Sequence, residues 1–220
     1  MQPGQPKWRR RSEARPGEII AAALVVFSEK GFAAARLDDI AARAGVSKGA
    51  LYLYFETKQD LFRAVVRETI APNLQAVAGF VGQSPLPFAD LIRLVFARIA
   101  EVITEGRMGA VAKMVIGESR NFPELAKVWH EEVVSVMLGA MSGAVTAAQA
   151  RGEVRAGDPQ LYVFSLAGPL LLGVLWREVF VPIGVKPVDL KALLAQHAEV
   201  ALRGMLLERG MLVETGEGRG

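Results

Sequence analysis

A short run of residues near the amino terminus has the residue types and spacing needed to read DNA. The run from Leu37 to Phe55 places apolar residues at helical spacing on both sides of Gly45, in the order short helix, glycine turn, short helix. Gly45 can take the positive φ that ends the first helix, and Ser47 can cap the second. The pattern predicts a helix-turn-helix whose second helix enters the major groove.

The side chains of this predicted motif divide into a packing set and an outward-facing set. Ile40, Ala41, Val46 and Leu51 are spaced to pack the two helices together. The outward positions of the second helix could then contact base edges or phosphates. Two of the outward-facing residues could have roles that do not involve DNA: Tyr52 could be a packing residue, and Lys48 could be a solvated charge at the end of a helix. The outward set is Lys48, Gly49, Ala50, Tyr52 and Tyr54.

Over about residues 18–61 the chain resembles the tetracycline repressor (TetR) family of transcriptional regulators. The resemblance implies that Lys48, Gly49 and Ala50 meet base edges and that Tyr52 and Tyr54 contact phosphates. It also implies that Lys58 binds a phosphate at the start of the fourth helix. The residues that carry it are Ala23, Phe27, Gly31-Phe32, Ile40-Ala41, Ala44-Gly45-Val46-Ser47, Leu51-Tyr52-Leu53-Tyr54-Phe55, Lys58 and Leu61.

One position departs from the family pattern. The family usually has Thr or Ser just ahead of the second helix, as a cap and a phosphate contact, whereas this chain has Ala35-Arg36. Arg36 can still reach a phosphate, but the helix cap is lost. The DNA-binding residues predicted from the sequence are therefore Arg36, Ser47, Lys48, Gly49, Ala50, Tyr52, Tyr54 and Lys58.

The whole chain reads as an all-α protein of about nine helices, because strand signals are scarce. Thr57 is expected to cap a long fourth helix that Pro72 kinks or shortens, and Asn121 and Asp158 are expected to cap later helices. After the fourth helix, the expected helices cover about residues 88–105, 108–117, 123–151, 161–181 and 187–209. The expected organisation is a disordered basic arm (1–17), a helix-turn-helix domain (18–67), a helical ligand-binding and dimerisation domain (68–212) and a disordered tail (213–220).

Charge is distributed unevenly along the chain. Residues 1–67 contain 12 Lys and Arg against 7 Asp and Glu, whereas residues 68–220 contain 14 against 16. The basic N-terminal region suggests a polyanionic partner, and the basic arm either enters the minor groove or only solubilises the chain.

The chain has no cysteine, which fits a reducing cytoplasm and excludes thiolate metal sites. The uncharged stretch from Leu161 to Trp176 is short for a bilayer, so we expect a buried or interface helix and no membrane span.

The rear part of the chain predicts a dimer and a small-molecule effector. Small residues on the last two predicted helices favour close packing, either between two copies of the chain, as in the family, or within one copy: Ala167, Gly168 and Gly173, then Ala192, Ala195, Ala198 and Ala201. Aromatic and flexible side chains could line an apolar pocket, with two arginines, Arg120 and Arg177, available to a polar ligand group. His130 and His197 lack a partner at metal spacing. The candidate ligand residues are Phe96, Met108, Met114, Arg120, Trp129, Met137, Phe164 and Trp176.

Taken together, these patterns predict a repressor that binds a palindromic operator in double-stranded DNA as a homodimer and is released by a largely apolar effector. The sequence carries no catalytic motif such as G-x-S-x-G, a P-loop or H-E-x-x-H, so we expect no enzyme activity, no cofactor and no metal. Two alternatives stay open, a helix-turn-helix regulator without a small-molecule ligand and an activator.

Overall fold

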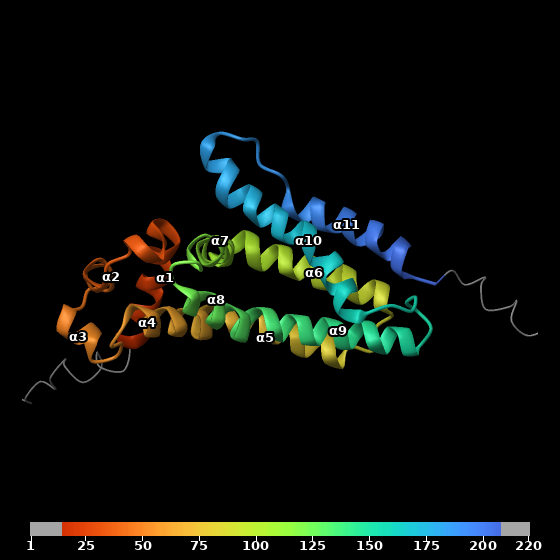
Figure 1. Cartoon of the computed structure of the whole chain (residues 1–220), viewed down its shortest axis with the longest axis horizontal. Helices are drawn as coiled ribbons and strands as arrows, with labels where there is room; N and C mark the ends of the chain where they lie inside the picture. Colours follow the sequence, from red (N-terminus) through yellow and green to blue (C-terminus); the bar gives the residue numbers. More distant parts are fainter. Residues whose placement is uncertain (1–14, 208–220) are drawn as a thin grey trace, which may run out of the picture. The chain divides into compact units, whose positions relative to one another are not determined.

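The computed structural model describes residues 15–207, in which the regular structure is helical apart from a single β-bridge between Val154 and Leu206 (Figure 1). Within this part of the chain nine helical runs follow one another, which confirms the predicted all-α fold. Three runs contain a π-helical turn. The elements are α1 (Arg15–Ala34), α2 (Leu37–Ala44), α3 (Lys48–Tyr52), α4 (Lys58–Val65) with η1 (Val66–Ile70) and α5 (Ala71–Gln83), α6 (Phe88–Glu105), α7 (Met108–Glu118), α8 (Pro123–Trp129) with η2 (His130–Val134) and α9 (Ser135–Ala150), α10 (Pro159–Leu175) with η3 (Trp176–Phe180) and η4 (Val181–Ile183), and α11 (Leu190–Met205).

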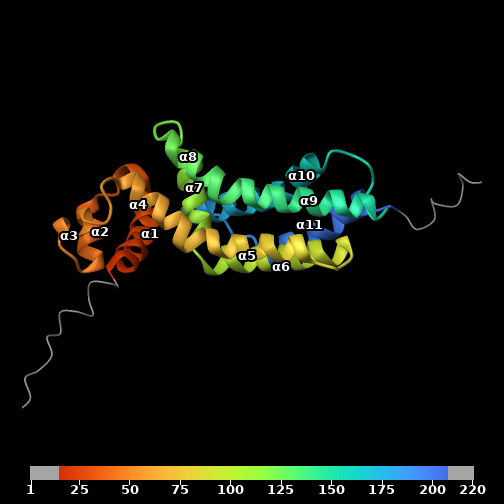
Figure 2. The same ribbon diagram turned by 90° about the horizontal axis from the view of Figure 1, so that it is seen from below.

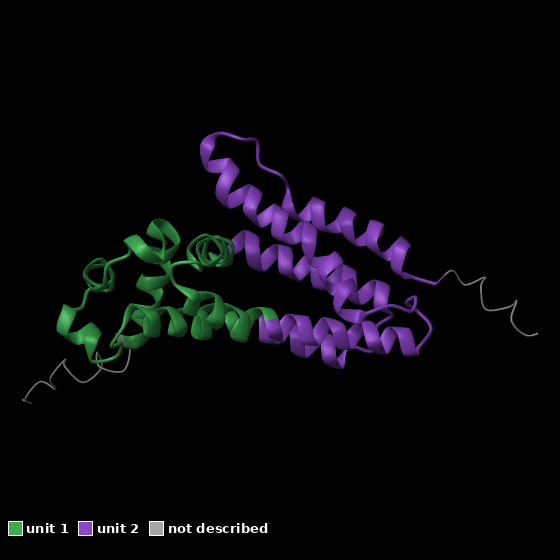
Figure 3. Ribbon diagram, viewed as in Figure 1, with its two compact units in different colours: residues 1–73, 107–134 green, residues 74–106, 135–220 purple. Residues whose placement is uncertain are grey.

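The chain folds into two compact units that do not follow the order of the sequence (Figure 3). Unit 1 contains residues 15–73 and 107–134, and unit 2 contains residues 74–106 and 135–207. The helices α7 and α8 therefore belong to the same unit as the helix-turn-helix. The domain boundary expected near residue 68 stays a prediction. Residues 15–17 of the expected disordered arm belong to α1, and the rest of the arm and the tail lie outside the described residues.

Unit 1 is built around a cluster of aromatic rings. Phe32 lies 5.6 Å from Phe27, 6.0 Å from Phe62 and 5.0 Å from Phe122, measured between ring centroids. These side chains come from α1, α4 and the turn before α8. The cluster therefore joins α4 and the turn before α8 to α1, which also packs against α2 and α7. Buried aromatic pairs of this kind stabilise a core beyond the area they bury.

Local end signals predicted some helix boundaries correctly and others wrongly. Thr57 accepts a hydrogen bond from the amide of Asp60, and Asp158 accepts one from the amide of Gln160, so both are caps as expected. The residue ahead of α8 is Phe122, which makes no side-chain cap bond, so the cap predicted at Asn121 is wrong. The chain instead makes a tight turn, in which the backbone amides of Asn121 and Phe122 both donate hydrogen bonds to the carbonyl of Glu118.

Pro72 does not end the fourth helical run. The π-helical turn η1 lies directly ahead of it, and the chain stays helical to Gln83. Proline lacks an amide hydrogen and its ring clashes with a carbonyl of the preceding turn. A wider turn relieves this conflict without breaking the helix. Of the two effects expected at Pro72, the shortening is therefore wrong, and the kink stays a prediction.

In unit 2, α11 packs against α6 and α10, and α10 also packs against α9 (Figure 2). Gly173 of α10 permits this close packing, because a Cβ there would lie 2.6 Å from a methyl carbon of Leu190. Ala198 of α11 is also buried. Part of the predicted small-residue stripe thus packs within one chain, whereas Ala167, Gly168, Ala192 and Ala195 are exposed.

Two helices in the described part of the chain are long and apolar enough to cross a membrane by length and composition alone. They are Pro123–Ala150 and Pro159–Ile183, and most of each is exposed on the single chain. The second is longer than the stretch considered in the sequence because it continues through Arg177 and Glu178. Charged residues inside both runs, including Glu131 and Glu132, make them poor membrane spans.

Candidate DNA-binding site

Backbone geometry in unit 1 confirms the helix-turn-helix expected from the sequence. Gly45 ends α2 with φ of 67°, in the left-handed region, and the amide of Val46 bonds to the carbonyl of Ala41 at 3.0 Å. Ser47 then caps α3, accepting a hydrogen bond from the amide of Ala50 at 3.2 Å. Ile40, Ala41 and Leu51 are buried, and Val46 is half-buried. The residues of the motif itself thus determine the orientation of α3 relative to α2.

The positions predicted to face outward from α3 are accessible. Lys48 and Gly49 are exposed, Ala50 is half-buried, and Tyr52 and Tyr54 are 44% and 40% exposed. Both tyrosines therefore have rings partly in solvent, which a pure packing role does not require. Both side chains are accessible enough to contact the DNA backbone.

Lys48 has a partner within the motif. Its ammonium lies 2.8 Å from a carboxylate oxygen of Asp38 on α2, and both side chains are more than half exposed. The hydrogen bond that Lys48 donates to Asp38 raises the pKa of Lys48, so the side chain stays charged. A contact with DNA must compete with this exposed ion pair, which is weak.

Lys58 is held by the protein itself. Its ammonium donates to the carbonyl oxygens of Phe32 at 2.6 Å, Ala35 at 3.0 Å and Ala33 at 3.3 Å, and it lies 4.5 Å from the ring centroid of Phe32. Burial lowers the pKa of Lys58, although the charge of Glu118 opposes this effect. An ammonium has three hydrogens, so a phosphate would have to replace one of these bonds. The phosphate contact at Lys58 stays a prediction.

The side chain of Arg36 makes no capping hydrogen bond at the start of α2. This agrees with the loss of the cap expected from an arginine where the family usually has Thr or Ser. The side chain of Arg36 is exposed. Its backbone carbonyl accepts the first hydrogen bonds of the helix, from the amides of Asp39 and Ile40. The two carboxylates of the first turn, Asp38 and Asp39, complement the helix dipole in place of a cap.

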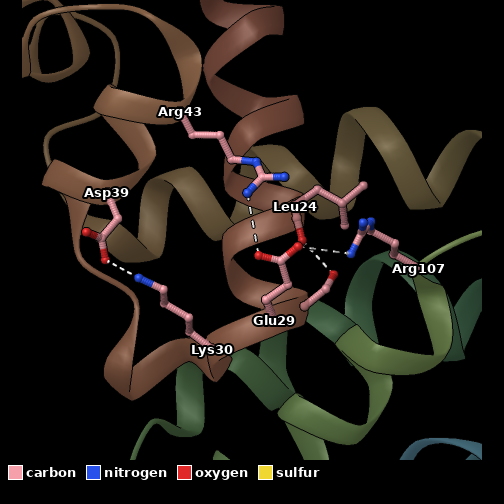
Figure 4. Close-up of polar contacts among 7 residues, drawn as sticks. Leu24, Glu29, Lys30, Asp39, Arg43 and Arg107 are labelled. Carbon is pink, nitrogen blue, oxygen red and sulfur yellow. Dashed lines mark hydrogen bonds and ion pairs between the residues drawn. The ribbon is translucent and has the colours of Figure 1, made fainter.

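A row of exposed ion pairs joins α1 to α2 and to the start of α7 (Figure 4). The Glu29 carboxylate lies 3.5 Å from Arg43 of α2 and 4.0 Å from Arg107, the residue before α7. Lys30 bonds to Asp39 at 2.8 Å and lowers the pKa of that carboxyl group. Single exposed pairs contribute little, and the two pairs that reach α2, Glu29–Arg43 and Lys30–Asp39, both come from α1.

Sequence reasoning missed three residues of this region. Leu53, directly after α3, is 83% exposed between the two tyrosines, and an exposed leucine at a DNA-reading surface suits contact with thymine methyl groups. Asp38 was not recognised as the partner of Lys48, although an acidic residue ten positions before a lysine is visible in the sequence. The third, Glu118, bonds to residues 85 and 86 positions earlier, and no local signal could have found it.

The candidate ligand residues fall into two sets. Met108, Met114, Arg120 and Trp129 belong to unit 1, and Phe96, Met137, Phe164 and Trp176 to unit 2. Their surroundings differ. Met114 is buried, Arg120 is exposed, and Phe164 is 59% exposed, which suits a protein interface better than a pocket wall. Trp176 donates to the carbonyl of Lys186. The assignment of a pocket to these residues stays a prediction.

Two polar side chains of unit 2 also have roles that the sequence did not reveal. The His197 ring stacks on Phe96 with centroids 5.8 Å apart, and its Nε2 atom is buried without a hydrogen-bond partner. Arg177, considered as a ligand contact, donates to the carbonyl of Ile103 at 2.8 Å. In the described part of the chain, no group of three or more His, Cys, Asp or Glu side chains is placed to hold a metal ion.

Comparison with known proteins supports the DNA-binding motif and extends beyond it. Residues 19–65 match the family described as bacterial regulatory proteins of the tetR family, and residues 88–182 match the tetracyclin repressor-like C-terminal domain. The transcriptional repressor BepR of Brucella suis biovar 1 is 32% identical over 155 residues, which covers 66% of this chain and 73% of BepR. The chain belongs to the TetR family. It is therefore a DNA-binding transcriptional regulator.

Solved structures of bacterial transcriptional regulators share the fold. The regulator FadR of Bacillus subtilis, in complex with stearoyl-CoA, has a TM-score of 0.70 at 22% identity, covering 86% of this chain and 98% of FadR. SmeT of Stenotrophomonas maltophilia in complex with triclosan has a TM-score of 0.70 at 24% identity, covering 94% of this chain and 98% of SmeT. In both pairs the likeness extends over nearly the whole of the known protein.

Proposed function

We propose that this TetR-family regulator is a cytoplasmic repressor that binds a palindromic operator as a homodimer and is released by a small, largely apolar effector. The observation that carries the proposal is the capped helix α3, which leaves Lys48, Tyr52 and Tyr54 accessible beside the exposed Leu53. The protein acts by binding alone, without catalysis. Reading a palindrome requires two such helices related by two-fold symmetry.

The exposed face of α10 and α11 supports the dimer. Large apolar side chains lie exposed along α10 at helical spacing, and Val200 adds to them from α11. The exposed small residues Ala167, Gly168, Ala192 and Ala195 would allow a second copy to approach closely. A face of this kind is costly to leave in water, and a second chain would cover it. The α10 side chains are Leu161, Phe164, Leu171 and Leu172.

The apolar effector is proposed from relatives of the same fold. FadR was solved with stearoyl-CoA and SmeT with triclosan, two ligands with large apolar parts. The helical region after residue 68 is rich in buried Val, Ile, Phe and Met, which suits an apolar ligand. Effector and operator would oppose each other reciprocally, with a coupling of about 1–3 kcal/mol.

The first test is selection of DNA from a random pool by the purified protein, followed by titration of the enriched sequence and of scrambled DNA. We expect an enriched palindrome, bound by two chains with a Kd that rises steeply with salt concentration. A screen for compounds that release this probe then identifies the effector. An asymmetric site bound by one chain would overturn the dimer proposal, and insensitivity to every apolar compound would favour a regulator without a ligand.

The direction of regulation needs a separate assay. A reporter gene placed behind the selected operator should be expressed less when the regulator is present, since a bound dimer blocks access to the promoter. Higher expression with the regulator present would make the protein an activator.

A further inference from the structure

Helix α1 is broken at the non-helical Gly31, and we call the segment from Gly31 to Arg36 the α1–α2 turn. It is held from two sides by charged groups distant in sequence. The carboxylate of Glu118, the last residue of α7, accepts hydrogen bonds from the amides of Phe32 at 2.8 Å and Ala33 at 2.6 Å. The ammonium of Lys58 binds the carbonyls of the same two residues. Hydrogen bonds to charged groups are among the stronger ones in proteins, and here four of them converge on one turn.

Gly31 shows that the carboxylate is fitted closely to this turn. Its φ of 76° lies in the left-handed region, where a residue other than glycine is strained. A Cβ at Gly31 would also lie 2.5 Å from the Oε1 atom of Glu118. The carboxylate therefore occupies the space that a side chain would need, and the glycine admits it.

The turn sets the direction in which the chain enters the helix-turn-helix. Only Ala35 and Arg36 separate the short segment Phe32–Ala34 from α2, and Arg36 gives α2 no side-chain cap. Helix α2 in turn packs on α3, the predicted recognition helix. The bonds to the turn act at this uncapped start together with the Lys30–Asp39 ion pair, so they share in setting the orientation of α2.

We infer that Glu118 is a positioning residue for DNA recognition: its carboxylate holds the α1–α2 turn in the conformation that orients α2 and α3, without touching DNA. The inference rests on the DNA-binding function and adds a residue far from the motif. When the carboxylate is lost, the turn samples other conformations and only a fraction of molecules present α3 correctly. The apparent Kd then rises by the inverse of that fraction.

The test compares Glu118→Ala, Glu118→Gln and Glu118→Asp in the full chain, on the selected operator and on scrambled DNA. Glu118→Ala should bind the operator about tenfold more weakly, as expected if a tenth of the molecules is competent. Binding to scrambled DNA and the slope of log K against log salt should not change, because no phosphate contact is removed. Glu118→Gln keeps one carbonyl acceptor and should recover part of the affinity, whereas the shorter Glu118→Asp should not.

Glu68→Ala is the matched control, since it removes an exposed carboxylate of the same unit and the same charge. Amide hydrogen exchange at Phe32 and Ala33 reports directly whether the turn is released. Faster exchange together with operator affinity equal to the control would overturn the inference. If Glu118→Ala does not fold, the folded Gln and Asp variants decide: weaker operator binding by Asp than by Gln supports the inference, and wild-type affinity in both rejects it.

A failure of the DNA-binding function itself would look different. The wild-type protein would then enrich no operator, whereas failure of the Glu118 inference leaves wild-type binding intact and the variants unaffected.

Discussion

At the scale of single residues, Lys48, which we expect to contact DNA, is held by a partner within the motif. Its pairing with Asp38 spans α2 and α3 in solvent. The ion pair holds the ammonium near the surface of α3, but the same carboxylate repels phosphates. Both members of the pair should therefore affect DNA affinity, in opposite directions.

We predict that Lys48→Ala weakens operator binding by about tenfold or more, because it removes a base-edge contact. Asp38→Asn should strengthen binding roughly two- to fivefold, since the ammonium no longer leaves an ion pair to reach DNA. Titrations at several salt concentrations check both. Equal affinity of Lys48→Ala and the wild type would remove Lys48 from the site.

At the scale of elements, the uncapped start of α2 is a local weakness. Arg36 has extended φ and ψ but a side chain that cannot accept an amide hydrogen bond. We predict that Arg36→Thr raises the free energy of unfolding by about 1 kcal/mol, the usual worth of a cap. Urea denaturation measures the change. Arg36→Ala is the control and should leave stability within about 0.5 kcal/mol of the wild type; a gain as large as that of Thr would mean that capping is not the cause.

Elements defined by short-range signals could be predicted from the sequence, and contacts between distant elements could not. Gly45, Ser47, Thr57 and Asp158 act on amides within a few residues, so their roles follow from local spacing. The shortening expected at Pro72 does not occur, because a π-helical turn accommodates the proline. The carbonyl partners of Lys58 and the amide partners of Glu118 depend on how α4 and α7 pack on α1, which no local pattern encodes.

At the scale of the whole molecule, the proposed mode of DNA binding requires association of two chains. We predict that Leu172→Glu, on the exposed face of α10, converts the dimer to a monomer and weakens operator binding, because two half-sites are then read independently. Analytical ultracentrifugation and operator titration measure the two effects. Leu94→Glu, an equally exposed leucine on α6, is the matched control. A dimer that survives Leu172→Glu would place the interface elsewhere.

The π-helical turn η1 also sets where the chain can lose a residue. Such a turn holds one residue more than the α-helix around it needs. Deleting one residue between Val66 and Ile70 would let the run close into regular α-helix, and the residues beyond it would keep nearly the same orientation around the helix axis. Leu74, Val77 and Val81, which are buried, would therefore stay on the side that they now face. The same deletion in a regular stretch of α-helix would instead rotate every later residue by about 100° around the axis.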